Sequence, residues 1–244
     1  MRNYLRKKFP EYHVLSAGSG DLIVLRAGRH RTLTGMTAAA GQAQIRAAEA
    51  NDLGVIAGIF AHYVTTSVAT FEETPPTVSE WGQKLSGISE LGLPFLVVEA
   101  GGRDGGDGRG GAGGGGARVA GYAYAVPWRP KAAYRHTVED SVYLAPGWTG
   151  RGFGRLLLTT LLAHCARAGA RQMIAVIADS GAGASVALHR ACGFTDAGRL
   201  AGVGFKHGRW IDTLLLQREL SADRAKGYAG AARKATDWGY DRTR

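Results

Sequence analysis

Hydrophobic positions follow helical and strand spacing in turn along residues 44–220. Residues 50–67 place apolar side chains three and four positions apart, which predicts an amphipathic helix capped by Asn51 or Asp52. Residues 172–178 are almost wholly apolar, as expected of a buried strand. Further helices are predicted at 77–91, 152–169 and 184–194, and further strands at 44–48, 94–100, 118–126, 136–146 and, after a turn, within 205–220. Helices between strands, combined with hairpins, predict an α/β domain whose mixed central sheet carries helices on both faces.

The two ends of the chain show no clean hydrophobic period. Residues 1–43 form a basic extension that lacks the apolar core and small-residue cleavage site of a secretory signal. We expect this extension to be disordered or not native, with translation starting at Met36, and a targeting peptide is the open alternative. Residues 221–244 are expected to form a frayed helix or a disordered tail. The folded domain is therefore predicted to span residues 44–220.

Residues 101–117 form a low-complexity segment in which 11 of 17 residues are glycine. The segment separates two strand-like stretches, so it is predicted to be a flexible insertion in a hairpin. A phosphate-binding loop is the alternative. Such a loop is followed directly by a helix, whereas here a strand pattern follows.

Charge and composition narrow the possible partners. The formal net charge is +10, but residues 1–36 carry seven basic and two acidic residues, and residues 221–244 carry six and three. The middle of the chain is therefore near neutral, which argues against a nucleic-acid partner. No apolar run reaches the roughly 18 residues of a membrane span, so no membrane partner is expected. Cys165 and Cys192 are too few for a disulfide framework and predict buried thiols in a reducing, cytoplasmic location.

Residues 138–158 combine a strand, a short loop rich in Gly and Arg, and the start of the strongest predicted helix. Unpaired N–H groups at the positive end of that helix would face one spot, which suits a pyrophosphate. Three glycines let the backbone approach closely, and two arginines add positive charge. These residues are Gly150, Gly152, Gly154, Arg151 and Arg155.

The loop resembles the acetyl-coenzyme A signature of the GNAT acyltransferases, Gln/Arg-x-x-Gly-x-Gly/Ala, matched here by residues 149–154. The resemblance extends to the phosphinothricin N-acetyltransferase branch of that family. It is carried by VATFEETPPTVSEW (68–81), AYRHTVEDSVYLAP (133–146), ASVALHRACGF (184–194) and VGFKHGRWIDTLLLQREL (203–220). The resemblance covers about residues 44–220, and it implies the GNAT acyl-CoA N-acyltransferase fold with acetyl-CoA as cosubstrate.

The resemblance also implies where acetyl-CoA contacts the chain. The implied cofactor-binding residues are Val142, Tyr143, Leu144, Thr149, Gly150, Arg151, Gly152, Phe153, Gly154 and Arg155. Two positions depart from the family, because Thr149 replaces the usual Gln or Arg and Ala182 replaces a polar residue that is commonly Asn. Each departure removes a side-chain hydrogen bond worth about 1 kcal/mol, which puts cofactor affinity in question more than cofactor identity.

Glu139 is the candidate catalytic base. Acetylation needs a neutral amine, and a free amine is mostly protonated at neutral pH, so a base must accept a proton directly or through water. Glu139 interrupts an apolar strand, and the resemblance places the proposed catalytic carboxylate of the branch at this position. A surface glutamate paired with an arginine is the alternative. Asp140 should point to the opposite face of the strand, and a structural role is preferred for it.

His189 is the second catalytic candidate, since the similar branch has a histidine there. It would act as an acid for the departing thiolate or would orient the substrate. A histidine satisfied by neighbouring backbone is the alternative. The oxyanion is expected to be stabilised by backbone N–H groups at the splayed end of strand 142–144, as in the family.

Cations and aromatic side chains in two loops predict the substrate site. Arginine and lysine suit a carboxylate or phosphinate, and aromatic rings would wall the substrate's carbon chain. The substrate-binding candidates are Phe71, Trp128, Arg129, Arg135, Lys206, His207 and Arg209, with Lys131, Tyr134 and Trp210 in the same cluster. A solvated cationic rim is the alternative for any single member.

The resemblance, together with these residues, implies an enzyme that transfers acetyl from acetyl-CoA to the amino group of a small acidic amino acid or analogue, of the phosphinothricin or methionine sulfoximine type. The expected partners are a small-molecule amine and a second copy of the chain, because relatives of this branch are commonly homodimers. No metal is expected. A protein N-terminal or lysine acetyltransferase is one alternative function, and a catalytically silent acyl-CoA-binding relative is another.

Overall fold

The computed structural model of the 244-residue chain describes residues 12–17, 21–26, 43–101, 117–179, 181 and 183–220. The chain divides into two compact parts, residues 1–38 and 39–244, which are described separately below. Two predicted segments, the Gly-rich residues 102–116 and the tail 221–244, lie outside the described residues.

The first part contains an antiparallel hairpin of β1 (Tyr12–Ala17) and β2 (Asp21–Arg26), in which Val14 pairs with Val24. The sequence analysis did not predict this hairpin. A weak local signal was present, because each strand has two residues of high β propensity and the sequence between the strands is Gly-Ser-Gly. That the extension is not native stays a prediction.

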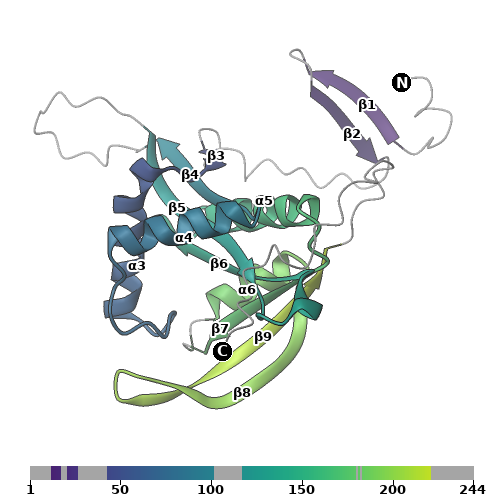
Figure 1. Ribbon diagram of the computed structural model, residues 1–244. Coiled ribbons are helices and arrows are strands. Elements are labelled where there is room, and N and C mark those ends of the chain that lie inside the picture. The colour runs from purple at the N-terminus through teal and green to yellow at the C-terminus, as the bar shows by residue number, and fades with distance from the viewer. Residues whose placement is uncertain are drawn as a thin grey trace, which may run out of the picture. The chain divides into compact units, whose positions relative to one another are not determined.

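The second part is built on a mixed sheet of seven strands in the order β3-β4-β5-β6-β7-β9-β8 (Figure 1). The strands are β3 (Ala43–Ala47), β4 (Phe95–Gly101), β5 (Ala117–Pro127), β6 (Thr137–Leu144), β7 (Gln172–Ala178), β8 (Thr195–Lys206) and β9 (Arg209–Glu219). Neighbouring strands are antiparallel except for β6 and β7, which run parallel. The antiparallel pairing of β4 with β5 runs out to the pair Gly101–Ala117, at the two ends of the Gly-rich segment.

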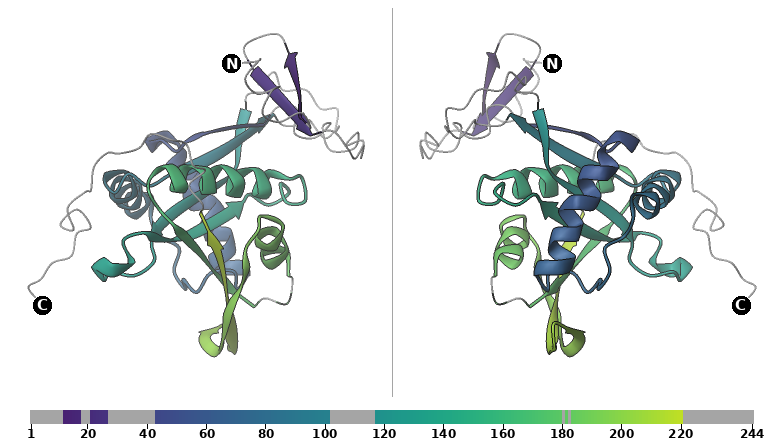
Figure 2. Two further views of the ribbon diagram at one scale, coloured as in Figure 1. Left: turned by 90° about the vertical axis from the view of Figure 1, so that its right-hand side faces the viewer. Right: turned by 90° about the vertical axis from the view of Figure 1, so that its left-hand side faces the viewer.

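Helices cover both faces of this sheet, which confirms the predicted architecture (Figures 1 and 2). The helices are η1 (Ala50–Asp52), α3 (Leu53–Thr66), α4 (Val78–Glu90), η2 (Ala132–Tyr134), α5 (Phe153–Arg167) and α6 (Ala184–Ala191). α3 and α4 lie on one face, and α5 and α6 lie on the other (Figure 2). Within the described ranges, no helix is long and apolar enough to cross a membrane.

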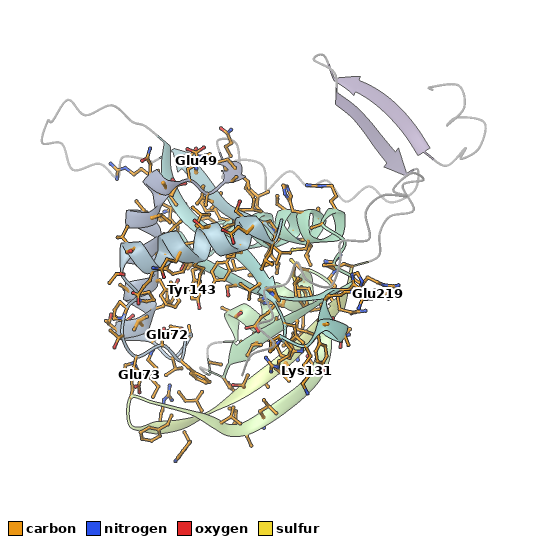
Figure 3. All side chains as sticks on the ribbon, in the orientation of Figure 1. Glu49, Glu72, Glu73, Lys131, Tyr143 and Glu219 are labelled. Carbon is orange, nitrogen blue, oxygen red and sulfur yellow. The ribbon has the colours of Figure 1, made fainter. Side chains whose placement is uncertain are left out.

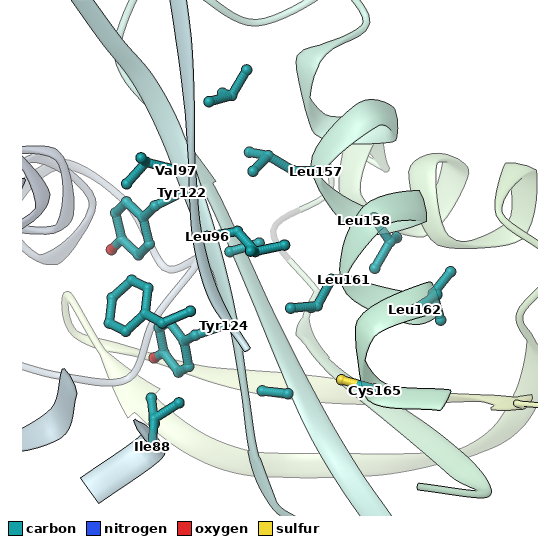
Figure 4. Close-up of a cluster of buried hydrophobic side chains, with 14 of the residues drawn as sticks. Ile88, Leu96, Val97, Tyr122, Tyr124, Leu157, Leu158, Leu161, Leu162 and Cys165 are labelled. Atoms are coloured by element: carbon teal, nitrogen blue, oxygen red, sulfur yellow. The ribbon is translucent and has the colours of Figure 1, made fainter. Parts of the chain in front are cut away.

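The two faces have different cores because side chains alternate along each strand. On the α3/α4 face, Tyr122 and Tyr124 of β5 pack edge-on against Trp81, with ring centroids 5.6 and 6.1 Å away. On the opposite face, the fully buried Leu157 and Leu161 of α5 fill the interior (Figure 4). The aromatic face positions α3 and the segment that follows it, whereas the aliphatic face positions the start of α5.

Two local expectations need correction. Asp52 lies at the start of α3 but makes no side-chain cap, because its carboxylate accepts hydrogen bonds from the Glu49 N–H and from Arg46. The strand β8 was missed altogether. Its sequence contains three glycines and its side chains are mostly exposed, so it lacks the hydrophobic alternation by which a half-buried strand is identified.

The Arg46 guanidinium ties β3 to two carboxylates and provides a stability test. It donates to both oxygens of Asp52 at 2.7 and 2.8 Å and to Glu99 at 2.6 Å, and Asp52 is only 5% exposed. Arg46→Met would leave this carboxylate unpaired, so the free energy of unfolding in urea at pH 7 should fall by about 2–3 kcal/mol. Arg190→Met, which breaks the exposed pair Arg190–Asp196, should cost less than about 1 kcal/mol.

The stability that the Arg46–Asp52 ion pair contributes depends on pH in a predictable direction. Arg46 lowers the pKa of Asp52 below its ordinary value, so this contribution is present above the ordinary carboxyl pKa and is lost as pH falls through the lowered value. Equal losses of unfolding free energy in Arg46→Met and Arg190→Met would contradict the role of Arg46 as the partner of Asp52. A difference between the two losses that grows as the pH falls would contradict it as well.

Candidate active site

The sheet opens between β6 and β7. Their parallel pairing covers only Thr137–Glu139 against Gln172–Ile174, whereas the antiparallel pairing of β6 with β5 continues to Leu144. Residues 140–144 therefore have a strand partner on one side only. Backbone N–H and C=O groups on the other side need partners, so an extended ligand with polar groups along its length fits this opening.

The loop after β6 leads to the positive end of α5. Gly150 and Gly152 have φ angles of +73° and +84°, in the left-handed region that favours glycine. Gly152 precedes Phe153, the first residue of α5, and the first turn of the helix carries no acidic side chain. Free N–H groups and the helix dipole make this terminus suited to a phosphate group. The open end of β6 and the N-terminus of α5 are close in the sequence, because the loop between them spans only residues 145–152.

The predicted cofactor residues divide into side chains that face solvent and side chains that face the core. Thr149, Arg151 and Arg155 are exposed, and the Arg151 guanidinium lies 4.9 Å from the centroid of the Trp148 ring. Phe153 is buried, and Gly154 packs so closely on α6 that a Cβ would lie 3.3 Å from Leu188. Their contribution to an anion site is therefore through backbone N–H groups. Ala182 lies outside the described residues.

Tyr63 is a site residue that the sequence analysis did not identify. Its hydroxyl donates to the Leu144 carbonyl at 2.7 Å, and its ring lies 5.3 Å from that of Tyr143. Tyr143 also packs against Phe60 of α3. Tyr63 thus fixes the end of β6 where the strand lacks a neighbour. The available signal was its position seven residues after Ile56, on the apolar face of α3.

Glu139 stands at the point where the sheet opens. It is half-buried, and alternation along β6 puts it on the same face as Tyr143 and opposite to Asp140. Burial raises the pKa of Glu139 above its ordinary value; Arg129 acts in the opposite direction, and the charge of Asp140 adds to the increase. The Arg129 guanidinium stacks 3.9 Å from the centroid of the Trp128 ring. The charge of Arg129 thus acts on Glu139, and the ring of Trp128 supports Arg129.

His189 requires a correction. It is 4% exposed, its Nε2 lies 2.9 Å from Asp140 Oδ2, and its Nδ1 lies 2.7 Å from the Ser185 carbonyl oxygen. Both ring nitrogens have protein partners, on the sheet face opposite to Glu139. The structure therefore places His189 as the partner of Asp140 and not as an acid or orienting group open to substrate.

Lys206 also differs from its predicted role. It is 3% exposed, and its ammonium donates to the Thr70 carbonyl at 2.8 Å. This bond joins β8 to the segment after α3, so Lys206 is not a free cation. Beside it, Phe71 lies on Gly204 and borders a hollow of about 480 Å³ that two carboxylates also line. The residues of this acidic hollow are Phe71, Glu72, Glu73, Thr74, Val203, Gly204 and Phe205. Tyr143, Glu72 and Glu73 follow one another from the sheet toward the β8–β9 hairpin (Figure 3).

The remaining predicted substrate residues are dispersed. Arg209 and Trp210 border a second hollow of about 340 Å³ with Asp179 and Asp212. His207 lies at the exposed turn between β8 and β9 with a φ of +50°. Arg135, Lys131 and Tyr134 are exposed around η2. The five cations therefore do not converge on one pocket, and Arg129 is the one whose charge acts on Glu139.

Comparisons with known proteins decide the family. The profile of the acetyltransferase (GNAT) family matches residues 90–194. The chain is 48% identical over 178 residues to a phosphinothricin N-acetyltransferase of Alcaligenes faecalis. The aligned residues cover 73% of this chain and 83% of the relative. The chain belongs to the GNAT acetyltransferase family. The predicted GNAT fold is thereby confirmed, with the open strand and α5 terminus described above.

Two further relatives place the chain within this family. It is 34% identical over 184 residues to an L-methionine sulfoximine/L-methionine sulfone acetyltransferase of Pseudomonas paraeruginosa, covering 75% of this chain and 98% of the relative. A GNAT phosphinothricin acetyltransferase from Sinorhizobium meliloti, crystallised with acetyl-CoA, superposes with a TM-score of 0.64 at 43% identity, covering 79% of this chain and 94% of that one.

The contact of Phe71 with Gly204 gives a test of the acidic hollow. A Cβ at residue 204 would lie 2.3 Å from the Phe71 ring, whereas a Cβ at Gly198 of the same strand meets nothing within 4 Å. Gly204→Ala should displace Phe71 and raise the KM for the amine about tenfold, with the KM for acetyl-CoA unchanged. Gly198→Ala is the matched control and should behave as wild type in steady-state kinetics. If both variants show the same amine KM, Phe71 does not border the amine site.

Proposed function

We propose that this protein transfers acetyl from acetyl-CoA to the α-amino group of a small acidic amino acid or analogue, of the phosphinothricin or methionine sulfoximine type. The observation that carries the proposal is the position of Glu139, a half-buried carboxylate at the point where β6 loses its neighbour β7. Relatives named for these two substrates support the acceptor class.

Acetyl-CoA has polar groups that match the backbone groups at the opening between β6 and β7. Backbone groups of residues 142–144 would pair with its extended arm, and the loop 149–152 with the N–H groups of α5 would hold its pyrophosphate. Acetyl-CoA supplies an activated acetyl thioester at that place. The exposed Arg151 and Arg155 add positive charge beside the pyrophosphate, which compensates for the absence of a longer side chain at Thr149.

Glu139 prepares the acceptor amine. A carboxylate within hydrogen-bond reach takes a proton from the substrate ammonium, directly or through water, and frees the lone pair for attack. Burial raises the pKa of Glu139 above its ordinary value, which makes its carboxylate a stronger base. Unpaired backbone N–H groups on the open side of residues 142–144 would stabilise the oxyanion formed when the amine attacks the thioester carbonyl. Its collapse would break the C–S bond and release coenzyme A as the thiol, which takes up the second proton of the attacking nitrogen.

Arg129 binds the acidic end of the acceptor in this proposal. Its guanidinium is exposed and fixed in place by the stack on Trp128 and by a bond from Nη1 to the Trp128 carbonyl at 3.1 Å. A planar guanidinium suits the paired oxygens of a carboxylate or phosphinate. Arg135, His207 and Arg209 are exposed and remain proposed contributors from the rim.

We also propose a homodimer and a cytoplasmic location. The β8–β9 hairpin forms the edge of the sheet, and Val203, Phe205 and Trp210 on it are 54%, 54% and 71% exposed. An apolar edge strand favours pairing with a second copy. Sedimentation equilibrium should give twice the chain mass, and Trp210→Ser should weaken the dimer; a monomer at micromolar concentration contradicts the dimer. The location is supported by Cys165 and Cys192, which are buried free thiols.

A thiol-release assay with acetyl-CoA tests the proposed function. The panel contains phosphinothricin, methionine sulfoximine, glutamate, neutral and basic amino acids, and a peptide with a free N-terminus. Release should depend on an acidic amino acid or analogue. Glu139→Gln should lower turnover by about 10²-fold or more with little change in acetyl-CoA affinity, because the amide cannot accept the proton.

The wild-type rate should fall with decreasing pH through the raised pKa of Glu139, above the range of an exposed glutamate. Release with the peptide alone would assign a protein acceptor. Cofactor binding without release to any amine would assign a silent relative, and an unchanged Glu139→Gln rate would remove Glu139 from the mechanism.

A further inference from the structure

Asp140 and His189 form a buried polar pair outside the acceptor site. Their side chains are 1% and 5% exposed and come from β6 and α6, 49 residues apart in the sequence. Nε2 of His189 lies 2.9 Å from Asp140 Oδ2, and Phe194 packs edge-on against the imidazole at 5.0 Å. Within the described part of the chain, Asp140 Oδ1 has no hydrogen-bond partner. His189 is therefore the group that satisfies this carboxylate.

The hydrogen bonds and the raised pKa of His189 together indicate the charge state of the pair. The Ser185 carbonyl can only accept, so Nδ1 carries a proton, and the raised pKa of His189 favours a second proton on Nε2, which then donates to Asp140 Oδ2. Burial lowers the pKa of His189, but the Asp140 hydrogen bond and charge outweigh burial and leave this pKa above its ordinary value. From α5, Asp140 is faced by Cys165, whose thiol pKa is raised to about 12 by burial and by Asp140, so that thiol stays neutral.

The pair lies where β6 needs support. Parallel pairing with β7 ends at Glu139–Ile174, and Asp140 is the next residue along β6. The hydrogen bond of Asp140 to His189 connects β6 to α6 directly after the point where the pairing of β6 with β7 has ended. Among the described residues of α6, His189 is the buried one, so the same bond anchors that helix. Because neighbouring side chains of a strand point to opposite faces, fixing Asp140 on one face sets the direction of Glu139 on the other.

We infer that the Asp140–His189 ion pair is a positioning pair for Glu139, which holds the base in register with the open edge of β6. The inference rests on the proposed function, in which Glu139 accepts the proton of the amine. Neither member of the pair touches substrate. Both act through the backbone of β6, and the carboxylate of Asp140 also acts through its charge on the neighbouring Glu139.

Kinetics of Asp140→Asn, His189→Leu and His189→Gln test this role. The first two should lower kcat about tenfold or more while the KM for acetyl-CoA changes less than about threefold, because the base is displaced and the cofactor slot is not. His189→Gln should recover part of the loss, since its amide N–H can donate to Asp140. Arg46→Met is the matched control for stability, because it breaks an ion pair on β3 and should leave kcat unchanged.

The pH profile separates positioning from a purely structural role. Glu139 is faced by Arg129 from the segment after β5 and by Asp140 on its own strand, and its partner residues on β5 and β7 are the apolar Val126 and Ile174. Asp140→Asn removes the negative charge that raises the Glu139 pKa, so the acid limb of kcat should move to lower pH. Nitrogen-15 NMR of wild type at pH 7 should show His189 protonated at both ring nitrogens.

Three results would overturn the inference. One is a loss of stability in Asp140→Asn and His189→Leu equal to that of Arg46→Met, with kcat and the acid limb unchanged. The second is a His189 ring that carries one proton at pH 7. The third is an inactive wild type, which contradicts the proposed function itself and this inference with it, whereas an active wild type with unaffected variants contradicts only the positioning role.

Discussion

The site depends on the early end of the parallel pairing between β6 and β7. Three residue pairs hold the two strands together, after which β7 pairs only with β9 and β6 pairs only with β5. A sheet that opens in its interior exposes backbone donors and acceptors that a continuous sheet would use. The opening is tolerated because other elements fix its borders, with Tyr63 bound to the end of β6 and His189 bound to its middle. The same constraint places Glu139 at the last paired position, beside the opening.

The alternation of side chains along β6 divides two adjacent carboxylates between two tasks. Glu139 faces the aromatic side of the sheet, where burial and the nearby Arg129 act on its pKa in opposite directions. Asp140 faces the aliphatic side, where the imidazole of His189 compensates its charge. A single strand thus carries one carboxylate beside the opening, which is the proposed base, and one carboxylate enclosed by its imidazole partner, because their surroundings differ.

Local sequence patterns predicted much of the fold, and long-range contacts explain what they missed. The helix at Phe153–Arg167 and the strand at Gln172–Ala178 have strong periods and clear ends, and both lie within the predicted ranges. The exposed, Gly-containing β8 has no such period. The roles of Glu139 and the glycine loop stay predictions, which rest on their local context and on the family resemblance. The partners of Lys206 and His189 lie 136 and 49 residues away, so no spacing rule could show that one ammonium is tied to a carbonyl or that the imidazole is enclosed.

A crystal structure of the protein with coenzyme A and the acetylated amino acid tests the central claim most directly. The account predicts the extended arm of coenzyme A along residues 140–144, its pyrophosphate at the N-terminus of α5, and the acetylated nitrogen within hydrogen-bond reach of Glu139 or of a water bound to it. Coenzyme A bound away from the β6–β7 opening, or an acetylated nitrogen on the face of Asp140, would contradict the account.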